Sequence, residues 1–389
     1  MSVGQKSIER LSELVSFATV SRDSNLALID WAEALLTEQG ARCRRTWNAD
    51  HTKANLLASF GPQTGSGVVL SGHTDVVPVD GQDWSSDPFV LTESNGRLYG
   101  RGSADMKGFL AVCMACLETA NLKTLTAPIH LAMSYDEEVG CIGVDGLIGD
   151  LIENVDQPQF VVIGEPTSMQ VVRAHKSINV FKTTVTGQAA HSSQPHRGGG
   201  AIFAAARMIE KLYQLGEDKR QLGGASGAEP PYTTVQVGLI DGGTAVNILP
   251  ARCQFQWEYR ALPDEDPDEL INALSDWVEA HVLPDLCRYA PNASVVTEAI
   301  ARVPPLVASE DSGIEPWIRG LPGVATGGSG EVGFATEGGN FKRAELPSIV
   351  CGPGSIDQAH QPDEFIEIDQ LEKCIQMVQA IIDGQSSAR

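Results

Sequence analysis

Histidine and carboxylate side chains follow apolar segments at several points in this sequence. His73 and Asp75 come directly after the apolar run 68–70. Because alternate residues of an extended chain point the same way, these two side chains can share one pocket. Ligands bind at the carboxyl ends of strands in open α/β sheets, and a histidine oriented by a carboxylate is typical of metal sites. The alternative at this position is a turn with an incidental histidine.

The same pattern recurs further along the chain. Four more carboxylates follow an expected strand or a glycine-rich turn: Asp105, Glu137, Glu138 and Glu165. Two adjacent buried glutamates are costly unless a metal or a positive charge compensates them. Because they alternate in direction, one can bind a metal while the other does chemistry. Taken singly, Asp105 could cap a helix and the glutamate pair could be a solvated acidic turn, but the recurrence favours a set of metal ligands.

The composition suits an α/β enzyme and argues against two classes of partner. A length of 389 residues suggests two domains or one elaborated domain, and 42% hydrophobic residues provide ample material for a core. The formal net charge is −22 and the pI is about 4.7. Proteins that bind nucleic acid carry basic stripes, so we expect no nucleic-acid partner and no anionic membrane surface.

Several features predict a cytoplasmic protein. No apolar run approaches the length of a membrane span, and residues 1–6 lack an apolar signal core. Cys113, Cys116 and Cys374 lie in apolar segments with helical periodicity, where thiols are ordinarily reduced and buried. We interpret the Cys113–Cys116 pair as core packing and not as a redox or zinc motif, because no second pair lies nearby.

Apolar periodicity predicts an α/β arrangement in the first part of the chain. The expected helices cover 7–17, 25–39 and 106–120, and the expected strands cover 53–60, 67–73, 128–134 and 160–163. A last strand over 348–351 and a last helix over 369–383 complete this α/β part, which we expect to form a mixed-sheet catalytic domain of residues 1–178 plus 303–389.

The pattern changes near residue 178. Alternating strands are expected over 178–186, 232–240, 246–260 and 293–302, with helices over 199–214 and 267–282. The order β-α-β-β-α-β is that of the ferredoxin-like split unit. We therefore expect an inserted α+β domain over 179–302.

One glycine pattern suggests a different function and is interpreted as a loop. Residues 328–333 fit the dinucleotide fingerprint G-x-G-x-x-G, which would point to an NAD enzyme. No clear buried strand precedes this segment and no helix is expected to follow it, and it lies late in the chain.

Over nearly its full length the chain resembles the co-catalytic zinc aminoacylase and carboxypeptidase family. The motifs that carry the resemblance are SGHTDVVP at 71–78, YGRGSADMKG at 99–108, DEEVG at 136–140, GEPT at 164–167 and CGPGSI at 351–356, followed by Ala359-His360. Together they are highly specific for the family. The loop at 84–89 and the 351–356 stretch resemble the branch that removes the acetyl group from N2-acetyl-L-ornithine.

The resemblance implies two zinc ions per subunit, with Co²⁺ or Mn²⁺ as substitutes. His73, Asp105 and Glu165 would bind one ion. Glu138 and His360 would bind the other, together with Asp105 as the bridging ligand. Imidazole and carboxylate donors suit these metals.

The resemblance also implies how a small N-acyl-amino acid would be hydrolysed. Asp75 would hold the His73 ring, and Glu137 would act as general base towards a water between the ions. The inserted domain, which would serve as a dimerisation and lid domain, would pair two subunits, and His191 would reach the neighbouring active site to stabilise the oxyanion. The chain has no G-x-S-x-G nucleophile elbow, which agrees with hydrolysis without a covalent intermediate.

Substrate contacts are carried over to three residues. Asn247 and Arg260 lie where relatives of the family contact substrate, and Lys176 is a further candidate. Polar strand positions and a surface ion pair are the structural alternatives for Asn247 and Arg260. Ser177 follows Lys176 where the deacetylase-like pattern has a glycine, and the segment 327–339 is unusually rich in glycine. Both departures leave the exact acyl-amino acid open.

Three other functions remain alternatives. Within the same chemistry, the chain could be a succinyl-diaminopimelate desuccinylase, a broader N-acyl-amino-acid hydrolase or a dipeptidase. A non-catalytic metal or amino-acid binding protein on the same scaffold would be expected to lack a ligand or the base. An NAD enzyme is favoured only by the glycine pattern at 328–333.

Overall fold

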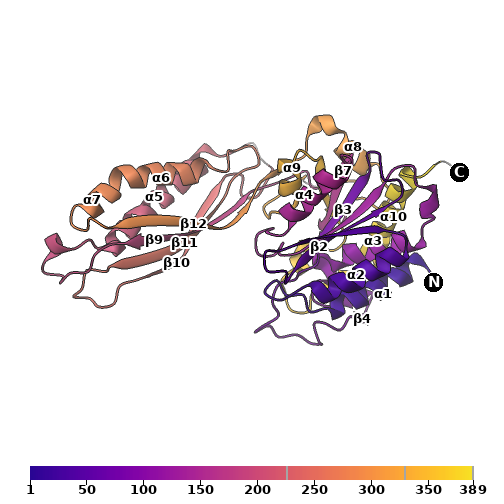
Figure 1. Cartoon of the computed structure of the whole chain (residues 1–389), viewed down its shortest axis with the longest axis horizontal. Helices are drawn as coiled ribbons and strands as arrows, with labels where there is room; N and C mark the ends of the chain where they lie inside the picture. The colour runs from indigo at the N-terminus through magenta and orange to yellow at the C-terminus, as the bar shows by residue number, and fades with distance from the viewer. Residues whose placement is uncertain (225–226, 328–329, 388–389) are drawn as a thin grey trace. The chain divides into compact units, whose positions relative to one another are not determined.

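The computed structural model describes residues 1–224, 227–327 and 330–387, which form two compact units (Figure 1). The first unit comprises Met1–Ala174, Leu306–Glu331 and Thr336–Arg389, and the second comprises His175–Pro305 and Val332–Ala335. The domain boundaries expected from the sequence, which assign separate functions to the two parts, stay a prediction.

A six-stranded mixed sheet forms the centre of the first unit. Its strands, in spatial order, are β1 (Arg42–Trp47), β2 (Ala54–Phe60), β6 (Ile129–Ser134), β3 (Val68–His73), β7 (Phe160–Pro166) and β15 (Ser348–Gly352). The last four are mutually parallel, whereas β1 and β2 run antiparallel to their neighbours. The predicted mixed α/β sheet is confirmed, and the carboxyl ends of its parallel strands share one edge.

Seven helices accompany this sheet in the described part of the first unit. They are α1 (Val3–Ser16), α2 (Leu26–Glu38), α3 (Gly108–Thr119), α4 (Val144–Asn154), α8 (Ile314–Arg319), α9 (Gly338–Arg343) and α10 (Ile368–Gly384). Shorter strands are β4 (Thr92–Ser94), β5 (Arg97–Tyr99) and β16 (Phe365–Glu367), which form a small sheet, and β8 (Ala174–His175), β13 (Leu306–Val307) and β14 (Glu331–Val332). The sequence did not predict β1, α4, α8 or α9.

The two faces of the central sheet differ in polarity because side chains alternate along each strand. On β3, Val68 and Leu70 belong to the apolar core that includes α3. A Cβ on Gly72, on the same face, would lie 2.8 Å from Met106 Cε, so the segment leading into α3 packs closely there. Ser71 and His73 therefore point to the opposite face, towards the carboxyl edge. Polar groups on the strands gather on the face that α3 does not cover.

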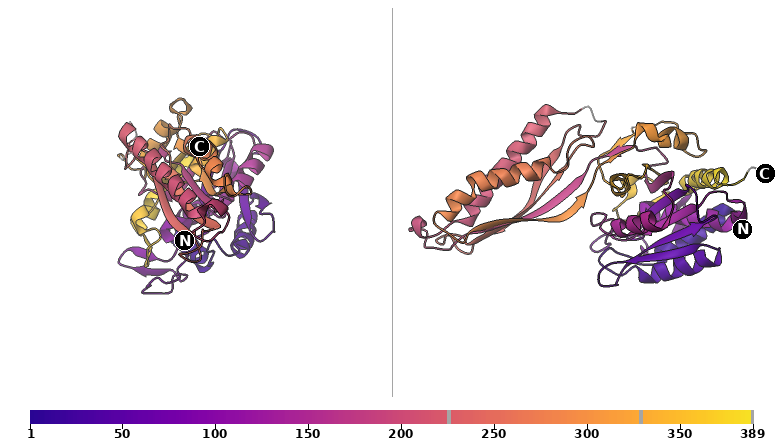
Figure 2. Two further views of the ribbon diagram at one scale, coloured as in Figure 1. Left: turned by 90° about the vertical axis from the view of Figure 1, so that its left-hand side faces the viewer. Right: turned by 45° about the horizontal axis from the view of Figure 1, so that its top comes forward.

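The second unit has the predicted ferredoxin-like arrangement. Its elements are β9 (Ile178–Thr186), α5 (Ala201–Leu222), β10 (Thr234–Gly242), β11 (Arg252–Arg260), α6 (Glu269–His281), α7 (Leu283–Cys287) and β12 (Ser294–Val303). The strands are ordered β10-β11-β9-β12 with every neighbour antiparallel. Helices α5 and α6 lie on the same face of this sheet (Figure 2). Alternate residues of β11 are buried against them, and Trp257 stacks on Phe181 with ring centroids 4.8 Å apart.

Some predicted boundaries are wrong for identifiable reasons. Helix α5 continues to Leu222 instead of ending at 214, because the buried Lys219 bonds to Glu269 at 2.7 Å and extends the packed face. Helix α3 begins at Gly108, and the residue that precedes it is Lys107, so Asp105 is not its cap. The glycine pattern at 328–333 begins with two residues outside the described part of the chain, and α9 starts within the glycine-rich 327–339 segment.

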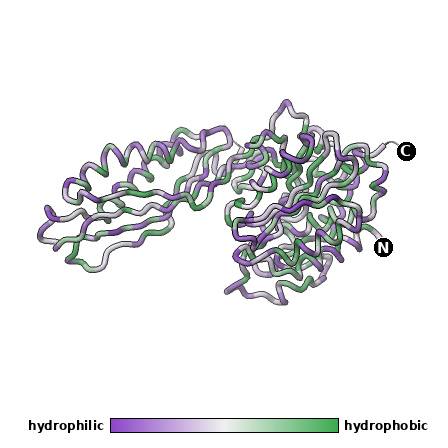
Figure 3. The backbone as a smooth tube through the Cα atoms, in the orientation of Figure 1, coloured by the Kyte–Doolittle hydropathy of each residue, from purple (hydrophilic) through white to green (hydrophobic). Residues whose placement is uncertain are grey.

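Hydrophobic and hydrophilic stretches alternate along the backbone of both units (Figure 3). In the part of the chain that the structure describes, every helix is too short or too polar to cross a membrane. The cytoplasmic location stays a prediction.

His130 on β6 lies on the polar face of the central sheet and is 2% exposed. Its Nδ1 hydrogen-bonds to Ser59 Oγ at 2.8 Å. Burial, with a smaller contribution from the charge of Arg42, lowers the pKa of His130 from 6.5 to about 4. The folded protein therefore keeps this ring neutral at pH values where the unfolded chain protonates it.

We predict that His130→Gln makes the fold less sensitive to acid. The neutral ring stabilises the fold fully above pH 6.5, and this stabilisation is lost as the pH falls from 6.5 towards 4, by about 3 kcal/mol in total. Urea unfolding at pH 7 and pH 5 measures the difference, and the variant should lose less free energy of unfolding over that interval. The exposed His51 gives the matched control, and equal pH slopes for His51→Gln and His130→Gln would contradict the prediction.

Candidate active site

His73 ends strand β3 and is fully buried. Its Nδ1 lies 2.9 Å from the Asp75 carbonyl oxygen, and its Nε2 lies 3.0 Å from Asp105 Oδ1. A carbonyl oxygen only accepts hydrogen bonds, so Nδ1 carries a proton and Nε2 is the atom turned towards Asp105. Burial opposes the charged ring, but the hydrogen bond from Nε2 to Asp105 raises the pKa of His73 well above its ordinary value. A cation bound between Nε2 and the carboxylate would take the place of that proton. This is the orientation of a histidine ready to bind a metal.

Asp75 holds the His73 ring, but with a different atom from the one predicted. The carbonyl oxygen makes the contact, while Asp75 Oδ1 lies 3.7 Å from Nδ1. The carboxylate instead accepts hydrogen bonds from Ser21 Oγ at 2.7 Å and from the backbone N–H groups of Glu137 and Glu138 at 3.2 and 3.4 Å. Asp75 thus fixes the two adjacent glutamates at the end of β6 as well as the histidine.

Asp105 lies between the two histidines. It is in the irregular segment Ser103–Lys107, where its φ and ψ of −120° and 95° are not helical. Its Oδ1 faces His73, and its Oδ2 lies 3.5 Å from His360 Nε2. Burial opposes the charged form of Asp105, yet hydrogen bonds from His360 and His73 hold its pKa below the ordinary value. A carboxylate whose two oxygens face two different histidines has the geometry of a bridging ligand.

The remaining predicted ligands lie around this carboxylate. Glu138 Oε2 is 3.0 Å from His360 Nε2. Two groups bring their donor atoms within 4.8 Å of one another: His73 with Asp105 and Glu138, and His73 with Glu137 and Glu165. The predicted ligands therefore converge, although these groups differ from the two predicted sets of three that share Asp105, and one of them includes Glu137, the predicted base. His360 is 52% exposed at its side chain, which places it on the open side of the cluster.

The electrostatics of the cluster favour a bound cation. Burial and the charge of Asp105 raise the pKa of Glu138 to about 7 and that of Glu165 well above its ordinary value. Burial also raises the pKa of Glu137, with His73 acting in the opposite sense. Hydrogen bonds that His360 donates to Asp105 and Glu138 raise the pKa of His360 to about 10. Two imidazoles and several carboxylates that repel one another fit divalent metals of the zinc type.

Two residues near the cluster were missed from the sequence. Cys141 Sγ lies 3.4 Å from Glu137 Oε1. Glu337, which precedes α9, is 1% exposed, and burial raises its pKa to about 7 while the Ser134 hydroxyl acts in the opposite sense. No strand pattern precedes Glu337 in the sequence, so strand-end reasoning could not find it. Cys141 lies only four positions after Glu137, so a tight turn after the glutamate pair was the signal that could have predicted their contact.

The other predicted catalytic residue lies in the second unit. His191 is exposed, and its Nδ1 hydrogen-bonds to Ser193 Oγ at 2.8 Å. The N–H of the adjacent Ser192 donates to the Asn247 carbonyl at 3.0 Å, so His191 and the exposed Asn247 lie on neighbouring segments. The side chains of both predicted residues are thus accessible.

The two predicted cationic substrate contacts also lie in the second unit, and both have partners there. Lys176 is 2% exposed, and its Nζ donates to the carbonyls of Pro230 and Tyr232, both at 2.7 Å. Arg260 Nε lies 3.6 Å from Glu258 Oε1. Burial, and next the charge of Arg260, lower the pKa of Lys176. The contacts of Lys176 favour a structural role within its own unit.

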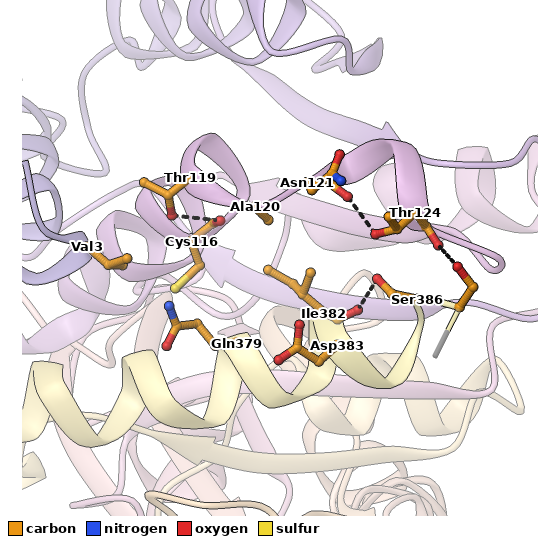
Figure 4. A pocket seen from close by; sticks show the side chains of 11 residues that line it. Val3, Cys116, Thr119, Ala120, Asn121, Thr124, Gln379, Ile382, Asp383 and Ser386 are labelled. Carbon is orange, nitrogen blue, oxygen red and sulfur yellow. Dashed lines mark hydrogen bonds between the residues drawn. The ribbon is translucent and has the colours of Figure 1, made fainter. Parts of the chain in front are cut away.

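A separate cleft of about 630 Å³ lies between the C-terminal ends of α3 and α10 in the first unit (Figure 4). Small and polar side chains line it, among them Cys116, Asn121, Gln379 and Asp383. None of the predicted site residues is part of this lining. The chemistry of the cluster is therefore separate from this cleft.

The profile of Peptidase family M20/M25/M40 matches residues 69–384. The chain belongs to this family. Among curated relatives, the acetylornithine deacetylase of Proteus mirabilis (strain HI4320) is 36% identical over 333 residues, covering 85% of this chain and 82% of the relative. The acetylornithine deacetylase of Myxococcus xanthus is 34% identical over 377 residues, covering 94% and 93%.

Solved structures share the fold of this M20/M25/M40 member. The M20 family metallo-carboxypeptidase Sso-CP2 of Sulfolobus solfataricus has a TM-score of 0.75 at 17% identity, covering 97% of this chain and 98% of that one. The Bacillus subtilis YXEP protein, described as a dinuclear metal binding peptidase of the M20 family, has a TM-score of 0.69 at 12% identity, covering 98% of each chain. The predicted resemblance and fold class are confirmed.

We predict that His360→Ala weakens the binding of one metal ion selectively. The variant removes the imidazole that faces both Asp105 and Glu138, so the affinity for one of two Zn²⁺ equivalents should fall by about 100-fold or more. Isothermal titration of the metal-stripped protein with Zn²⁺ measures both equivalents. His191→Ala serves as the control and should retain the unmodified titration. Unchanged titration of His360→Ala would remove His360 from the ligand set.

Proposed function

We propose that this chain is a two-metal amidohydrolase that converts N2-acetyl-L-ornithine into L-ornithine and acetate, a step of arginine biosynthesis. The choice of substrate rests on the identity of 34–36% to two acetylornithine deacetylases over most of the chain. The convergent histidines and carboxylates at the carboxyl edge of the sheet support the hydrolytic chemistry. The lower identity of the solved structures supports the fold alone.

The proposed metal ligands are His73, Asp105, Glu138, Glu165 and His360. Zinc is the proposed metal, with Co²⁺ or Mn²⁺ as substitutes, because imidazole and carboxylate donors suit all three. When bound, the metals would polarise the acyl carbonyl and lower the pKa of water. The Asp75 carbonyl keeps the His73 ring in the tautomer that presents Nε2, and the Asp75 carboxylate anchors the glutamate pair.

Glu137 is the proposed general base. Its Oε1 is engaged by the Cys141 thiol, which leaves Oε2 to take a proton from the attacking water. Burial favours the protonated carboxyl group, so the proton is retained until it is delivered to the amine nitrogen as the C–N bond breaks. The water oxygen forms the new bond to the acyl carbon, and acetate and the free amine leave. No covalent enzyme intermediate is required.

The proposal for the second unit is that it pairs two subunits and contributes to the substrate site. His191 would donate a hydrogen bond to the oxyanion of a neighbouring subunit, and Asn247 and Arg260 would contact the amino-acid part of the substrate. The exposure of His191 and Asn247 is compatible with these roles. The resemblance to the family supports this assignment, and the size of a homodimer in solution is its first test.

A substrate panel tests the proposed function. We expect release of free amine from N-acetylornithine well above release from succinyl-diaminopimelate, N-acetylmethionine or a dipeptide, measured with ninhydrin in the presence of Zn²⁺ or Co²⁺. Chelation should abolish the release. Metal-dependent release from another compound of the panel would overturn the proposed substrate and leave the proposed hydrolytic chemistry in place. No release from any of the compounds by the folded, metal-bound protein would overturn the proposed function.

We predict that Glu137→Gln lowers kcat by about 100- to 10,000-fold, the usual contribution of a general base. Glutamine keeps the size of the side chain but cannot accept the proton. Metal content, measured by mass spectrometry of the purified variant, should remain at the unmodified stoichiometry. Near-normal turnover in Glu137→Gln would show that another group is the base.

A further inference from the structure

Glu364 is a buried carboxylate, 1% exposed, that accepts four hydrogen bonds. Its Oε1 accepts from the backbone N–H groups of Ala104 and Asp105 at 2.9 and 3.1 Å. Its Oε2 accepts from the backbone N–H of Gly102 at 3.0 Å and from Arg101 Nη1 at 2.8 Å. One buried carboxylate thus holds the turn at 101–105 by hydrogen bonds, and this turn carries Asp105.

This turn has no regular structure that would fix it. Gly102 has a φ of 80°, in the left-handed region, and Asp105 and Met106 depart from helical angles before α3 begins. The N–H groups at the start of a helix lack helical acceptors and need other partners. Glu364 supplies the acceptor from the far end of the chain, so the backbone position of Asp105 depends on it.

Gln82 connects the same turn to His360. Its Oε1 accepts from Arg101 Nη2 and from Trp84 Nε1, the latter at 3.1 Å, and its Nε2 donates to the His360 carbonyl at 2.9 Å. The Arg101 guanidinium lies 4.9 Å from the centre of the Trp84 ring, a cation–π contact. Gln82 therefore bonds directly to Arg101, the partner of Glu364, and to the backbone of a proposed metal ligand.

The backbone around His360 needs such support. His360 has a φ of 63° and Asp363 a φ of 55°, a region that L-residues rarely adopt. The Ser85 N–H and Oγ donate to the two carboxylate oxygens of Asp363 at 2.8 and 2.7 Å. Residues 360–364 are held both by the 82–85 loop and by the turn that carries Asp105.

We propose that Gln82, Arg101 and Glu364 form a positioning clamp that fixes the distance between the Asp105 carboxylate and the His360 ring. The clamp rests on the proposed function only in that these two residues are its metal ligands. Arg101 compensates the charge of Glu364, which would be costly if it were buried alone. None of the three clamp residues contacts the reacting atoms in this assignment; each acts through a ligand.

Gln82→Ala is the primary test, because Gln82 is only half-buried and its removal leaves the core intact. The variant loses the donor to the His360 carbonyl and the acceptor for Arg101. We expect about 10-fold weaker Zn²⁺ binding in competition with a chelator, a changed visible absorption spectrum of the Co²⁺-loaded protein, and kcat about 10-fold lower with KM within about twofold. Glu364→Gln should change the same readouts further.

Glu118→Gln provides the matched control. Glu118 on α3 is a largely buried carboxylate of the same unit that pairs with Lys6 and Arg10 of α1, so its loss tests the general effect of removing an ion pair. This variant should lower Tm and leave Zn²⁺ affinity and the Co²⁺ spectrum unchanged. If Gln82→Ala and Glu364→Gln behave like Glu118→Gln, the clamp is merely structural and the proposal is overturned.

The metal readouts separate this proposal from the proposed function. Zn²⁺ competition and the Co²⁺ spectrum are measured without substrate. Weaker metal binding in Gln82→Ala together with an unmodified protein that releases no amine from any substrate would support the clamp and overturn the function. Normal deacetylation by the unmodified protein, together with unchanged metal binding in both clamp variants, would support the function and overturn the clamp.

Discussion

The crowding of buried negative charge at the carboxyl edge of the central sheet is the constraint on which the rest of the first unit depends. Asp105 and Glu165 are buried and Glu137 and Glu138 are partly buried. Burial and mutual repulsion raise the pKa of the three glutamates. His73 and His360 offset part of this charge at Asp105. A bound divalent cation removes the repulsion, so metal affinity and folding free energy are linked.

The sheet accommodates this charge by separating its two faces. Alternation along β3 gives the apolar face to α3 and turns Ser71 and His73 to the other side. A ligand set of this kind could not lie on the α3 face, where even a Cβ on Gly164 would collide with the Phe109 ring. The close packing on one face leaves the other for polar groups, and the parallel strands bring their ends to one edge. The fold thus determines where the chemistry can occur.

Sequence reasoning found residues that converge in the fold and missed the residues that support them, for a physical reason. His73 and Glu138 follow apolar strands, and strand alternation with parallel pairing is enough to predict that their side chains meet. Glu364 binds a turn some 260 positions earlier in the chain, and its role depends on how two loops meet, which no periodicity encodes. Asp75 was assigned to the right neighbour but the wrong atom, because sequence does not distinguish a carbonyl from a carboxylate contact. Helix α5 extended past its apolar pattern because the ion pair of Lys219 with the exposed Glu269, not apolar packing, holds its last turns.

Acetyl and succinyl substrates differ in the charge that a binding site must accommodate. A succinyl substrate carries one more carboxylate than an acetyl substrate, and its desolvation would require a free cation. Of the two cationic candidates, Lys176 already donates to two backbone carbonyls. Arg260, whose Nε lies 3.6 Å from Glu258 Oε1, is proposed to contact the amino-acid part of the substrate and not its acyl group. An acetyl group needs no such partner, while the cationic side chain of ornithine suits a chain of net charge −22. The charge balance of this molecule therefore agrees with the substrate that the relatives indicate.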